Sequence, residues 1–376
     1  MKYFLSILLL GLLFKCSETF DPPNPEDLFE DYKGSVVLIY NEYFYEIKVQ
    51  DLTYYYSPNS EEKFFFNRED LENNYSIGFG TGFIISNKGE IITNRHVIEP
   101  ENIDYKEAFF EFHKQKYNQI LEIIVEKQDS IEMIERFFPY VKNNYDNVRY
   151  GENYYYDDDY GNSNNEFRVK ITAKYEELNY AKTHYIKIAE YIEQIDFENI
   201  IPKLNIVNIG IAYDDTYVTK KEDLQECVII RTSNNEDVDL ALIQTKTKIF
   251  NKPPQKIFNF SDNNPNIKEN PKEHKERDIR NPVRINDDVF MIGYNRGFIL
   301  ANTREGIKSQ FTSGKISQEN DGERILYTIP TLEGSSGSPI IDKWGNLVAV
   351  NFAKLSNSQG FSFGIPVYEV KKFYEE

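Results

Sequence analysis

Six short runs of branched and aromatic side chains, separated by turn residues, fill residues 283–367. Such runs, bounded by glycine, proline, asparagine or aspartate, are typical of β-strands. Six strands within fewer than 90 residues predict a closed antiparallel barrel, because closure removes the exposed edges that a small open sheet would present. The predicted strands are residues 289–294, 311–317, 324–329, 339–342, 347–352 and 360–367.

A second group of strand-like runs lies earlier in the chain and predicts another barrel. Residues 78–98 contain two runs joined by an Asn-Lys-Gly turn, and this pattern favours a hairpin. Residues 42–75 are polar and aromatic, and we expect them to form a hairpin with a long loop. The remaining predicted strands of this group are residues 35–40, 205–213, 227–232 and 239–245.

The predicted fold class is therefore mainly β, with two antiparallel β-barrels. Residues 261–282 are polar and interrupted by prolines, which is typical of a linker between barrels. These boundaries assign residues 21–260 to the first barrel. They assign residues 283–376 to the second barrel and a short C-terminal helix.

The strand pattern of the first barrel is interrupted at about residues 101–203. Apolar side chains recur there at helical spacing, first within residues 120–138 and again within residues 186–195. Asp129 and Glu132 have the spacing of a capping box at the start of a helix. We therefore expect a helical insertion in the first barrel.

The N-terminus predicts export. Lys2 precedes an apolar stretch at residues 4–14, which is too short to cross a bilayer and is typical of a signal peptide. We assign residues 1–20 to this signal peptide and expect no integral membrane span after its removal. The protein would then be secreted, periplasmic or surface-associated. A lipid anchor at Cys16 stays open, because Lys15 beside it fits neither a small-residue cleavage site nor a lipoprotein site well.

The formal net charge of −18 argues against a nucleic-acid partner and against electrostatic docking to anionic lipid. The acidic segment at residues 156–166 does not fit the EF-hand calcium loop. That loop requires an acidic or amide residue five places before its glycine, and Tyr156 occupies this place relative to Gly161. We expect neither a metal site nor a cofactor, and the sequence does not indicate an oligomeric state.

Three segments supply the side chains that nucleophilic acyl transfer requires. They are TNRHVI with His96, DLALI with Asp239, and EGSSGSPIID with Ser336. A serine hydroxyl is a poor nucleophile until an imidazole accepts its proton, and a carboxylate must hold that imidazole in the right tautomer. Asp237 lies two residues before Asp239 and would share its strand face, so periodicity alone does not separate them.

The glycines around Ser336 predict an oxyanion hole. Gly334 frees the backbone so that the N–H groups of Gly334 and Ser336 can point at one spot, where a tetrahedral intermediate develops its negative charge. Gly337 then lets the chain turn away. Ser335 and Ser338 are the nearest alternatives to Ser336 as the nucleophile.

With these motifs the chain resembles the trypsin-like, chymotrypsin-fold serine proteases of the HtrA type. Those proteases contain T-N-x-H-V, D-apolar-A-apolar and G-[NS]-S-G-x-P in this order, and the order His, Asp, Ser separates them from subtilisins and α/β-hydrolases. The resemblance selects Asp239 rather than Asp237, and Ser336 rather than its neighbouring serines. It covers residues 35–41, 78–98, 205–245 and 283–367.

The resemblance implies a chymotrypsin-like double barrel with an active site in the cleft between the barrels. It implies a serine endopeptidase that cleaves protein or peptide substrates through a covalent acyl-enzyme. HtrA-type proteases usually continue into PDZ domains, and the nine residues after Val367 are too few for one.

The other histidines, His113, His184 and His274, lie in charged segments and are expected to be exposed.

The resemblance also places the specificity pocket between the segment before the nucleophile and a later strand. None of the residues at these places is negatively charged, so a small or medium apolar side chain is expected at the cleaved residue. The residues concerned are Pro330, Thr331, Leu332, Val350 and Phe352.

Two other functions remain open from the sequence. One is a catalytically silent protease fold that serves as a binding protein, and the intact His-Asp-Ser set argues against it. The other is a surface lipoprotein whose barrels act only as a scaffold, which depends on lipidation of Cys16.

Overall fold

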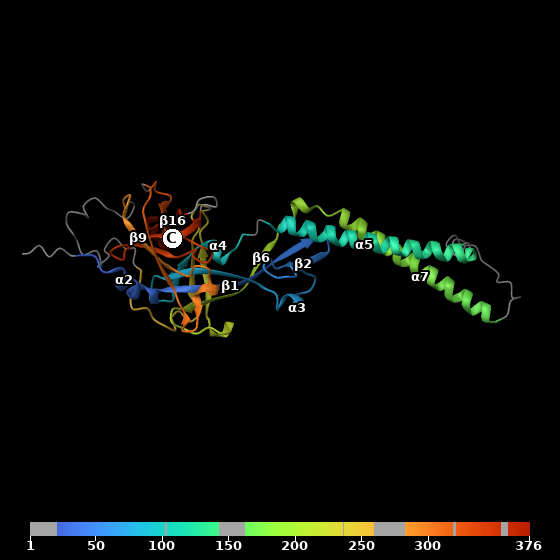
Figure 1. Cartoon of the computed structure of the whole chain (residues 1–376), viewed down its shortest axis with the longest axis horizontal. Helices are drawn as coiled ribbons and strands as arrows, with labels where there is room; N and C mark the ends of the chain where they lie inside the picture. The colour runs from blue at the N-terminus through green and yellow to red at the C-terminus, as the bar shows by residue number, and fades with distance from the viewer. Residues whose placement is uncertain are drawn as a thin grey trace, which may run out of the picture. The chain divides into compact units, whose positions relative to one another are not determined.

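The computed structural model describes residues 21–101, 104–142, 162–235, 237–258, 283–318, 321–354 and 360–376 (Figure 1). The predicted signal peptide, the predicted linker at residues 261–282 and most of the acidic segment at residues 156–166 lie outside this part of the chain. None of the described helices is long and apolar enough to cross a membrane.

The first sheet is a closed barrel with two extra strands. Its strand order is β3-β2-β1-β4-β5-β8-β7-β6, and an additional pairing between β1 and β6 closes six of these strands into a ring. The pairs between β1 and β4, β4 and β5, β5 and β8, and β7 and β8 are antiparallel. The strands are β1 Val36–Val49, β2 Leu52–Tyr56, β3 Phe64–Phe65, β4 Ser76–Ile84, β5 Glu90–Thr93, β6 Lys203–Tyr213, β7 Gln225–Thr232 and β8 Ala241–Thr245.

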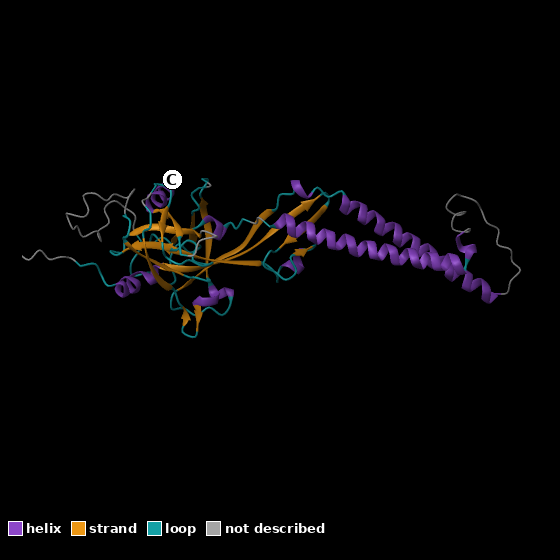
Figure 2. Cartoon of the chain, turned by 45° about the horizontal axis from the view of Figure 1, so that its top comes forward, coloured by secondary structure: helices purple, strands orange, loops and turns teal. Residues whose placement is uncertain are grey.

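The second sheet contains all six strands that the sequence predicts for residues 283–367. Its order is β12-β9-β14-β15-β16-β13, and a bridge between Ile316 and Tyr327 joins the two edge strands. The strands are β9 Asp288–Gly293, β12 Gln310–Lys315, β13 Ile325–Tyr327, β14 Pro339–Asp342, β15 Leu347–Lys354 and β16 Ser362–Pro366. The predicted double-barrel fold class is thereby confirmed (Figure 2). A small hairpin, β10 Asn302–Thr303 and β11 Gly306–Ile307, lies between β9 and β12.

Helices occupy the ends and connections of the barrels. Asn24 caps the first of them by accepting a hydrogen bond from the backbone N–H of Glu26 at 3.3 Å. The helices are α2 Pro25–Tyr32, α3 Arg68–Leu71, α4 Arg95–Ile98, α8 Phe298–Ala301 and α9 Val367–Glu375, with 3₁₀ turns η1 Lys33–Ser35, η2 Phe197–Asn199 and η3 Lys221–Asp223. The two long helices are α5 Tyr105–Phe137 and α7 Asn162–Glu193.

The chain divides into two compact units. The first comprises residues 1–46, 55–101 and 204–376, and the second comprises residues 47–54 and 102–203. The second unit contains α5, α7 and residues 47–54, where β1 ends and β2 begins. Strand β1 is longer than the sequence predicts, because Tyr43, Phe44 and Tyr45 are buried in succession in a segment that also carries Glu42 and Glu46.

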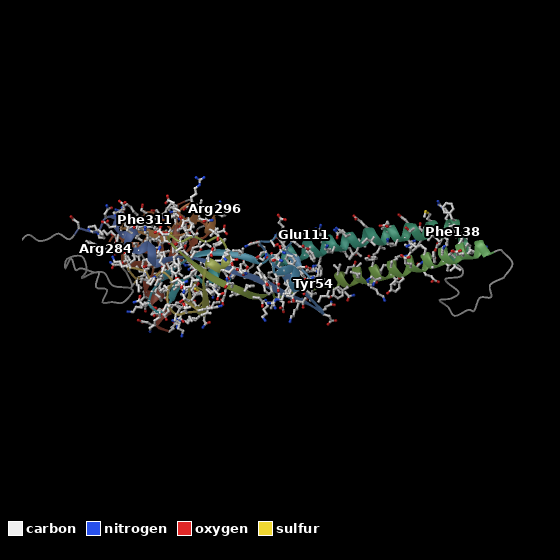
Figure 3. The ribbon with its side chains drawn as sticks, turned by 90° about the horizontal axis from the view of Figure 1, so that it is seen from below. Tyr54, Glu111, Phe138, Arg284, Arg296 and Phe311 are labelled. Atoms are coloured by element: carbon white, nitrogen blue, oxygen red, sulfur yellow. The ribbon has the colours of Figure 1, made fainter. Side chains whose placement is uncertain are left out.

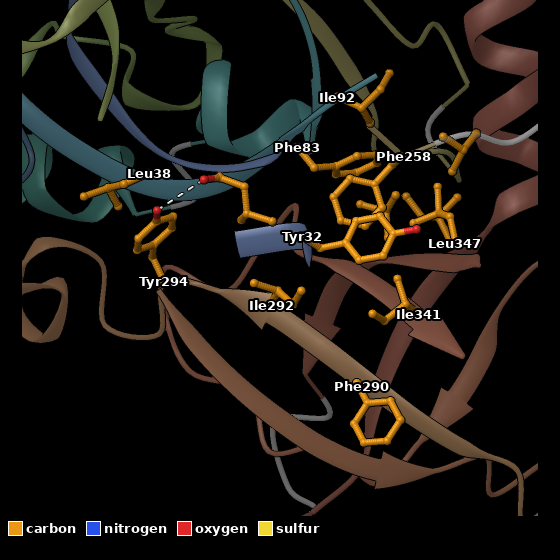
Figure 4. Close-up of a cluster of buried hydrophobic side chains, with 14 of the residues drawn as sticks. Tyr32, Leu38, Phe83, Ile92, Phe258, Phe290, Ile292, Tyr294, Ile341 and Leu347 are labelled. Atoms are coloured by element: carbon orange, nitrogen blue, oxygen red, sulfur yellow. Dashed lines mark hydrogen bonds between the residues drawn. The ribbon is translucent and has the colours of Figure 1, made fainter. Parts of the chain in front are cut away.

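One of the apolar clusters in the first unit contains side chains from both barrels. Phe83 and Ile92 from the first barrel belong to the same buried cluster as Ile292 and Ile341 from the second (Figure 4). The Tyr294 hydroxyl, fully buried at the end of β9, donates to the carbonyl oxygen of Val36 at 3.2 Å. Apolar burial on this scale stabilises the pairing of the barrels, since each fully buried large side chain contributes about 1.5–3 kcal/mol.

Helix α5 begins earlier than the sequence indicates. Asp129 and Glu132 lie inside α5, so the predicted capping box at that point is wrong. In the first half of α5 the buried residues are Phe109 and His113. The other buried side chains of α5, Ile131 and Ile134, pack with Tyr175 of α7.

His113 is buried, and the expectation that it is exposed is wrong. Its side chain lies among the rings of Tyr54, Phe109, Phe112 and Phe197, and the residue is 3% exposed. Its Nδ1 lies 2.9 Å from the Phe109 carbonyl oxygen, which can only accept, so Nδ1 carries the hydrogen. In the neutral ring Nε2 therefore accepts from the Tyr54 hydroxyl at 3.1 Å.

Burial lowers the pKa of His113 from its ordinary value. The unfolded chain therefore binds a proton near pH 6.5 that the folded second unit does not bind. We expect the free energy of unfolding of this unit to fall as the pH decreases below about 6.5. His113→Phe should abolish that part of the pH dependence in thermal melts at pH 5 to 8, whereas His184→Phe, at an exposed position of α7, should leave it unchanged. Equal pH dependence in all three proteins would contradict the prediction.

Candidate active site

His96 lies in α4, directly after β5, at the rim of the first barrel. The Asn41 side chain from β1 fixes this short helix by donating to the carbonyl oxygens of Val97 at 3.0 Å and Ile98 at 2.8 Å. Asn41 is fully buried, so these bonds do not compete with water. A helix of four residues has little stability of its own. The position of His96 is therefore set by the contacts of α4 with the barrel.

Asp239 contacts His96 at two points. One carboxylate oxygen accepts the backbone N–H of His96 at 3.0 Å, and the other lies 2.5 Å from ring atom Nδ1. Because a carboxylate only accepts, Nδ1 carries the hydrogen and Nε2 is left as the basic nitrogen. The Asn94 side chain donates to the backbone carbonyl oxygen of Asp239 at 2.8 Å and so ties the two segments together.

The structure separates the two candidate aspartates. Asp237 is exposed, and its backbone N–H donates to the Asn235 side chain at 3.1 Å. The Asp239 side chain is 16% exposed and the His96 side chain is 41% exposed. Asp239 is therefore the aspartate that faces His96, with the imidazole open to solvent on its other side. The catalytic roles of both residues stay predictions.

The turn that carries Ser336 is held by Thr81 of β4. The Thr81 backbone N–H donates to the Ser336 carbonyl oxygen at 2.8 Å, and its hydroxyl donates to the Gly334 carbonyl oxygen at 2.8 Å. A Cβ atom at Gly337 would lie 3.2 Å from the Asn94 nitrogen, so the turn sits against the residue two places before His96. The turn and His96 are thus brought to the same region of the first unit.

The three serines of this turn differ in exposure. Ser335 is 1% exposed and its hydroxyl donates to the Leu332 carbonyl oxygen at 2.6 Å, while Ser338 is fully buried. Ser336 is partly exposed, so it is the serine of the three that a solvent-borne substrate can reach. Within the described residues no hydrogen bond joins the Ser336 hydroxyl to the His96 ring.

The peptide between Glu333 and Gly334 has a defined orientation. The Arg296 backbone N–H donates to the Glu333 carbonyl oxygen at 2.5 Å, and the Arg296 side chain points into solvent (Figure 3). In a trans peptide the C=O and N–H groups point in opposite directions, so the Gly334 N–H is directed away from Arg296. Across the part of the chain that the structure describes, neither Gly334 N–H nor Ser336 N–H has an acceptor, as a vacant oxyanion hole requires.

The five predicted pocket residues do not share one environment. Pro330 and Leu332 are exposed, whereas Thr331 is 6% exposed and its hydroxyl lies 2.8 Å from that of Ser362. Phe352 is partly buried beneath the Arg324 guanidinium, whose carbon lies 5.8 Å from the ring centre.

Val350 has no exposed surface and belongs to the apolar core, so it offers nothing to a substrate in this structure. The strand alternation of β15 turns Asn351 toward Ser335 instead.

Three polar residues of the site escaped the sequence analysis as functional candidates. They are Thr81, Asn94 and Asn351. Each has a local signal: Thr81 stands between two glycines of β4, Asn94 precedes the short helix of His96, and Asn351 interrupts the apolar run of β15. A buried polar side chain in an apolar run must find a hydrogen-bond partner, and this requirement is what points to such positions.

Histidine, cysteine and carboxylate side chains also occur elsewhere in the described residues. No group of three or more His, Cys, Asp or Glu side chains there could hold a metal ion. The buried Cys227 has a free thiol, and burial raises its pKa to about 12, so it is no nucleophile at neutral pH.

Part of the chain is similar to known proteins. Residues 204–350 match the family described as trypsin-like peptidase domain, a range that contains Asp239 and Ser336 and begins after His96. One solved structure that is similar, the serine endoprotease from Yersinia pestis, is 14% identical with a TM-score of 0.43. The match covers 94% of this chain and 66% of that chain, so this chain spans less than two thirds of the length of that protein. No match was found among curated proteins.

The backbone conformation of the turn that carries Ser336 can be tested at Gly337, which has a φ of +85°. Its Cβ would overlap the Thr81 carbonyl oxygen and lie 2.5 Å from the Thr93 hydroxyl. Gly322 has a φ of +92° and open space around its Cβ position. We expect Gly337→Ala to lower the free energy of unfolding by an additional 1–3 kcal/mol or so relative to Gly322→Ala, the usual range for overpacking. Equal losses in urea unfolding would show that the contact is not tight.

Proposed function

We propose that this chain, whose residues 204–350 match the family described as trypsin-like peptidase domain, is a serine endopeptidase that acts through Ser336, His96 and Asp239. One observation carries the proposal. The buried side of the His96 imidazole is paired with Asp239, and the only partly exposed serine of the neighbouring glycine-rich turn is Ser336. A protein that only binds a partner would not need a His96 imidazole with its hydrogen on Nδ1 beside the turn that carries Ser336.

In the proposed reaction, Ser336 Oγ attacks the carbonyl carbon of the substrate while His96 Nε2 accepts the hydroxyl proton. The C–N bond breaks when the imidazolium returns this proton to the leaving amine, and an acyl-enzyme remains. Water then attacks the acyl group with His96 again as the base. Asp239 stays ionised and stabilises the imidazolium through its hydrogen bond to Nδ1.

The N–H groups of Gly334 and Ser336 would stabilise the oxyanion of each tetrahedral intermediate. Donors that are already oriented need no rearrangement when charge develops, and one such donor is typically worth about 10²–10³ in turnover. The missing hydrogen bond between Ser336 and His96 is compatible with this mechanism, because catalytic hydrogen bonds often tighten only when substrate is bound.

The proposed substrates are peptide segments with a small or medium apolar side chain at the cleaved residue. Leu332, beside the turn, is 44% exposed and offers an apolar contact. No acidic side chain is among the predicted pocket residues, which disfavours selection of lysine or arginine at that position.

Labelling with a fluorophosphonate probe tests the nucleophile. We expect the wild-type protein to react covalently and Ser336→Ala to lose the reaction, because the probe bonds to the activated serine oxygen. Ser338→Ala and Ser335→Ala serve as matched controls and should retain at least part of the labelling, since both hydroxyls are buried. Full labelling of Ser336→Ala would overturn the assignment.

Two aspartate variants test the orienting carboxylate. Asp239→Asn should keep the fold but reduce kcat by about 10⁴-fold, because the amide favours the wrong imidazole tautomer. Asp237→Asn removes the same charge at the exposed position two residues earlier and should leave peptide hydrolysis within about twofold, as is usual for surface substitutions away from a site. Similar losses in the two variants would contradict the role of Asp239.

A further inference from the structure

We infer that Asn351 is a positioning residue for the oxyanion hole. Its side-chain amide holds the peptide between Ser335 and Ser336 so that the Ser336 N–H faces the reacting carbonyl oxygen. The inference rests on the proposed function, since it concerns a donor used only in acyl transfer. In this role Asn351 affects catalysis although its side chain does not contact the substrate.

Asn351 is tied to the nucleophile turn by four hydrogen bonds. Its Nδ2 donates to the Ser335 carbonyl oxygen at 2.9 Å and to the Ser335 hydroxyl at 3.3 Å. Its backbone N–H donates to the Ser338 carbonyl oxygen at 2.9 Å, and its own carbonyl oxygen accepts from Gly337 at 2.8 Å. The backbone pair sets the distance between β15 and the turn, and the side chain then reaches the peptide that precedes Ser336.

The orientation of the Asn351 amide is dictated by its partners. The Ser335 carbonyl oxygen can only accept, so the NH₂ end must face it. The Oδ1 end faces the Tyr327 hydroxyl, which donates to it at 2.8 Å and also lies 3.0 Å from the Phe363 carbonyl oxygen. Tyr327 is fully buried and Asn351 is 2% exposed, so no water competes for these bonds. The amide therefore has one stable orientation.

The consequence for catalysis follows from the planarity of the peptide. The Ser335 C=O and the Ser336 N–H belong to one trans peptide and point in opposite directions. A hydrogen bond from Asn351 to the carbonyl oxygen thus turns the N–H to the opposite side, where it has no acceptor within the described structure. The same bond polarises the peptide and makes its N–H a stronger donor, as in other hydrogen-bonded chains.

The two donors of the proposed hole are held in different ways. The Gly334 N–H is oriented by the backbone N–H of Arg296, which any residue except proline would supply at that position. The Ser335 carbonyl oxygen, which sets the direction of the Ser336 N–H, accepts from the Ser338 backbone N–H at 3.1 Å and from the Asn351 amide at 2.9 Å. The shorter of these two bonds comes from a side chain, so a substitution can remove it. Substitution of Asn351 should therefore affect one donor selectively.

Asn351→Asp tests this inference, because aspartate has nearly the same shape and cannot donate to the Ser335 carbonyl oxygen when ionised. Tyr327→Phe is the second variant, which leaves Asn351 in place and removes the hydroxyl that anchors its Oδ1. For wild type and both variants we would measure kcat and KM on a peptide substrate, and melting temperature. We would also measure the affinities for a peptide trifluoromethyl ketone and for the product peptide. The ketone forms an anionic tetrahedral adduct, whereas the product peptide uses only ground-state contacts.

We expect Asn351→Asp to lower kcat at least tenfold with KM nearly unchanged, since a whole oxyanion donor is worth about 10²–10³. Affinity for the ketone should fall by a similar factor, and affinity for the product peptide should stay within about twofold. Tyr327→Phe should show a smaller loss of the same kind and decides the question if Asn351→Asp does not fold. Parallel losses of ketone and product affinity, or unchanged ketone affinity, would overturn the inference. A wild-type protein that fails to label with fluorophosphonate would instead refute the proposed function.

Discussion

The first unit depends on a single buried residue, Thr81, at the junction of its two barrels. Its backbone N–H and hydroxyl hold the carbonyl oxygens of Ser336 and Gly334, and its hydroxyl accepts the backbone N–H of Tyr294 at 3.0 Å. Its own carbonyl oxygen accepts the Thr93 hydroxyl at 2.8 Å. One threonine therefore connects the strand before His96, the turn that carries Ser336 and the first strand of the second barrel. The glycines beside it in β4 leave room for this convergence, since a Cβ at Gly80 or Gly82 would overlap apolar side chains.

The sequence predicted those parts of the fold that depend on local periodicity. The strands of the second barrel and the pairing of His96 with the segment of Asp239 follow from short apolar runs and from motifs of a few residues. The extent of α5 did not follow, because only Phe109 and His113 are buried in its first half and no side-chain cap marks its start at Tyr105. The burial of His113 depends on Tyr54, which lies 59 residues away in sequence, and no local pattern reveals such a contact.

In the candidate site, too, features that depend on a local sequence pattern could be predicted and features that depend on contacts across the sheet could not. The turn around Ser336 could be predicted because glycines at positive φ and a following proline leave a recognisable pattern in the sequence. The residues that line the expected specificity pocket could not be predicted in the same way. Which of Val350 and Asn351 points to the core and which to the turn depends on the register of β15 within the sheet. A shift of one residue along a strand exchanges the two faces, so an apolar residue assigned to the pocket can belong to the core. Val350 is such a case, and its neighbour Asn351 faces the turn.

These polar contacts also explain why the turn can hold two unpaired N–H groups. An N–H group without an acceptor costs about 1–3 kcal/mol when it is buried. Gly334 is buried and Ser336 is partly exposed, and the N–H of neither has an acceptor in the described part of the chain. Around them, the carbonyl oxygens of Glu333, Gly334, Ser335 and Ser336 all accept hydrogen bonds from buried or backbone donors. With every carbonyl oxygen fixed on the far side, rotation of a peptide to satisfy its N–H would break a bond already made. The free donors are therefore maintained by the bonds of their neighbours, and the proposed oxyanion hole would be in place before a substrate binds.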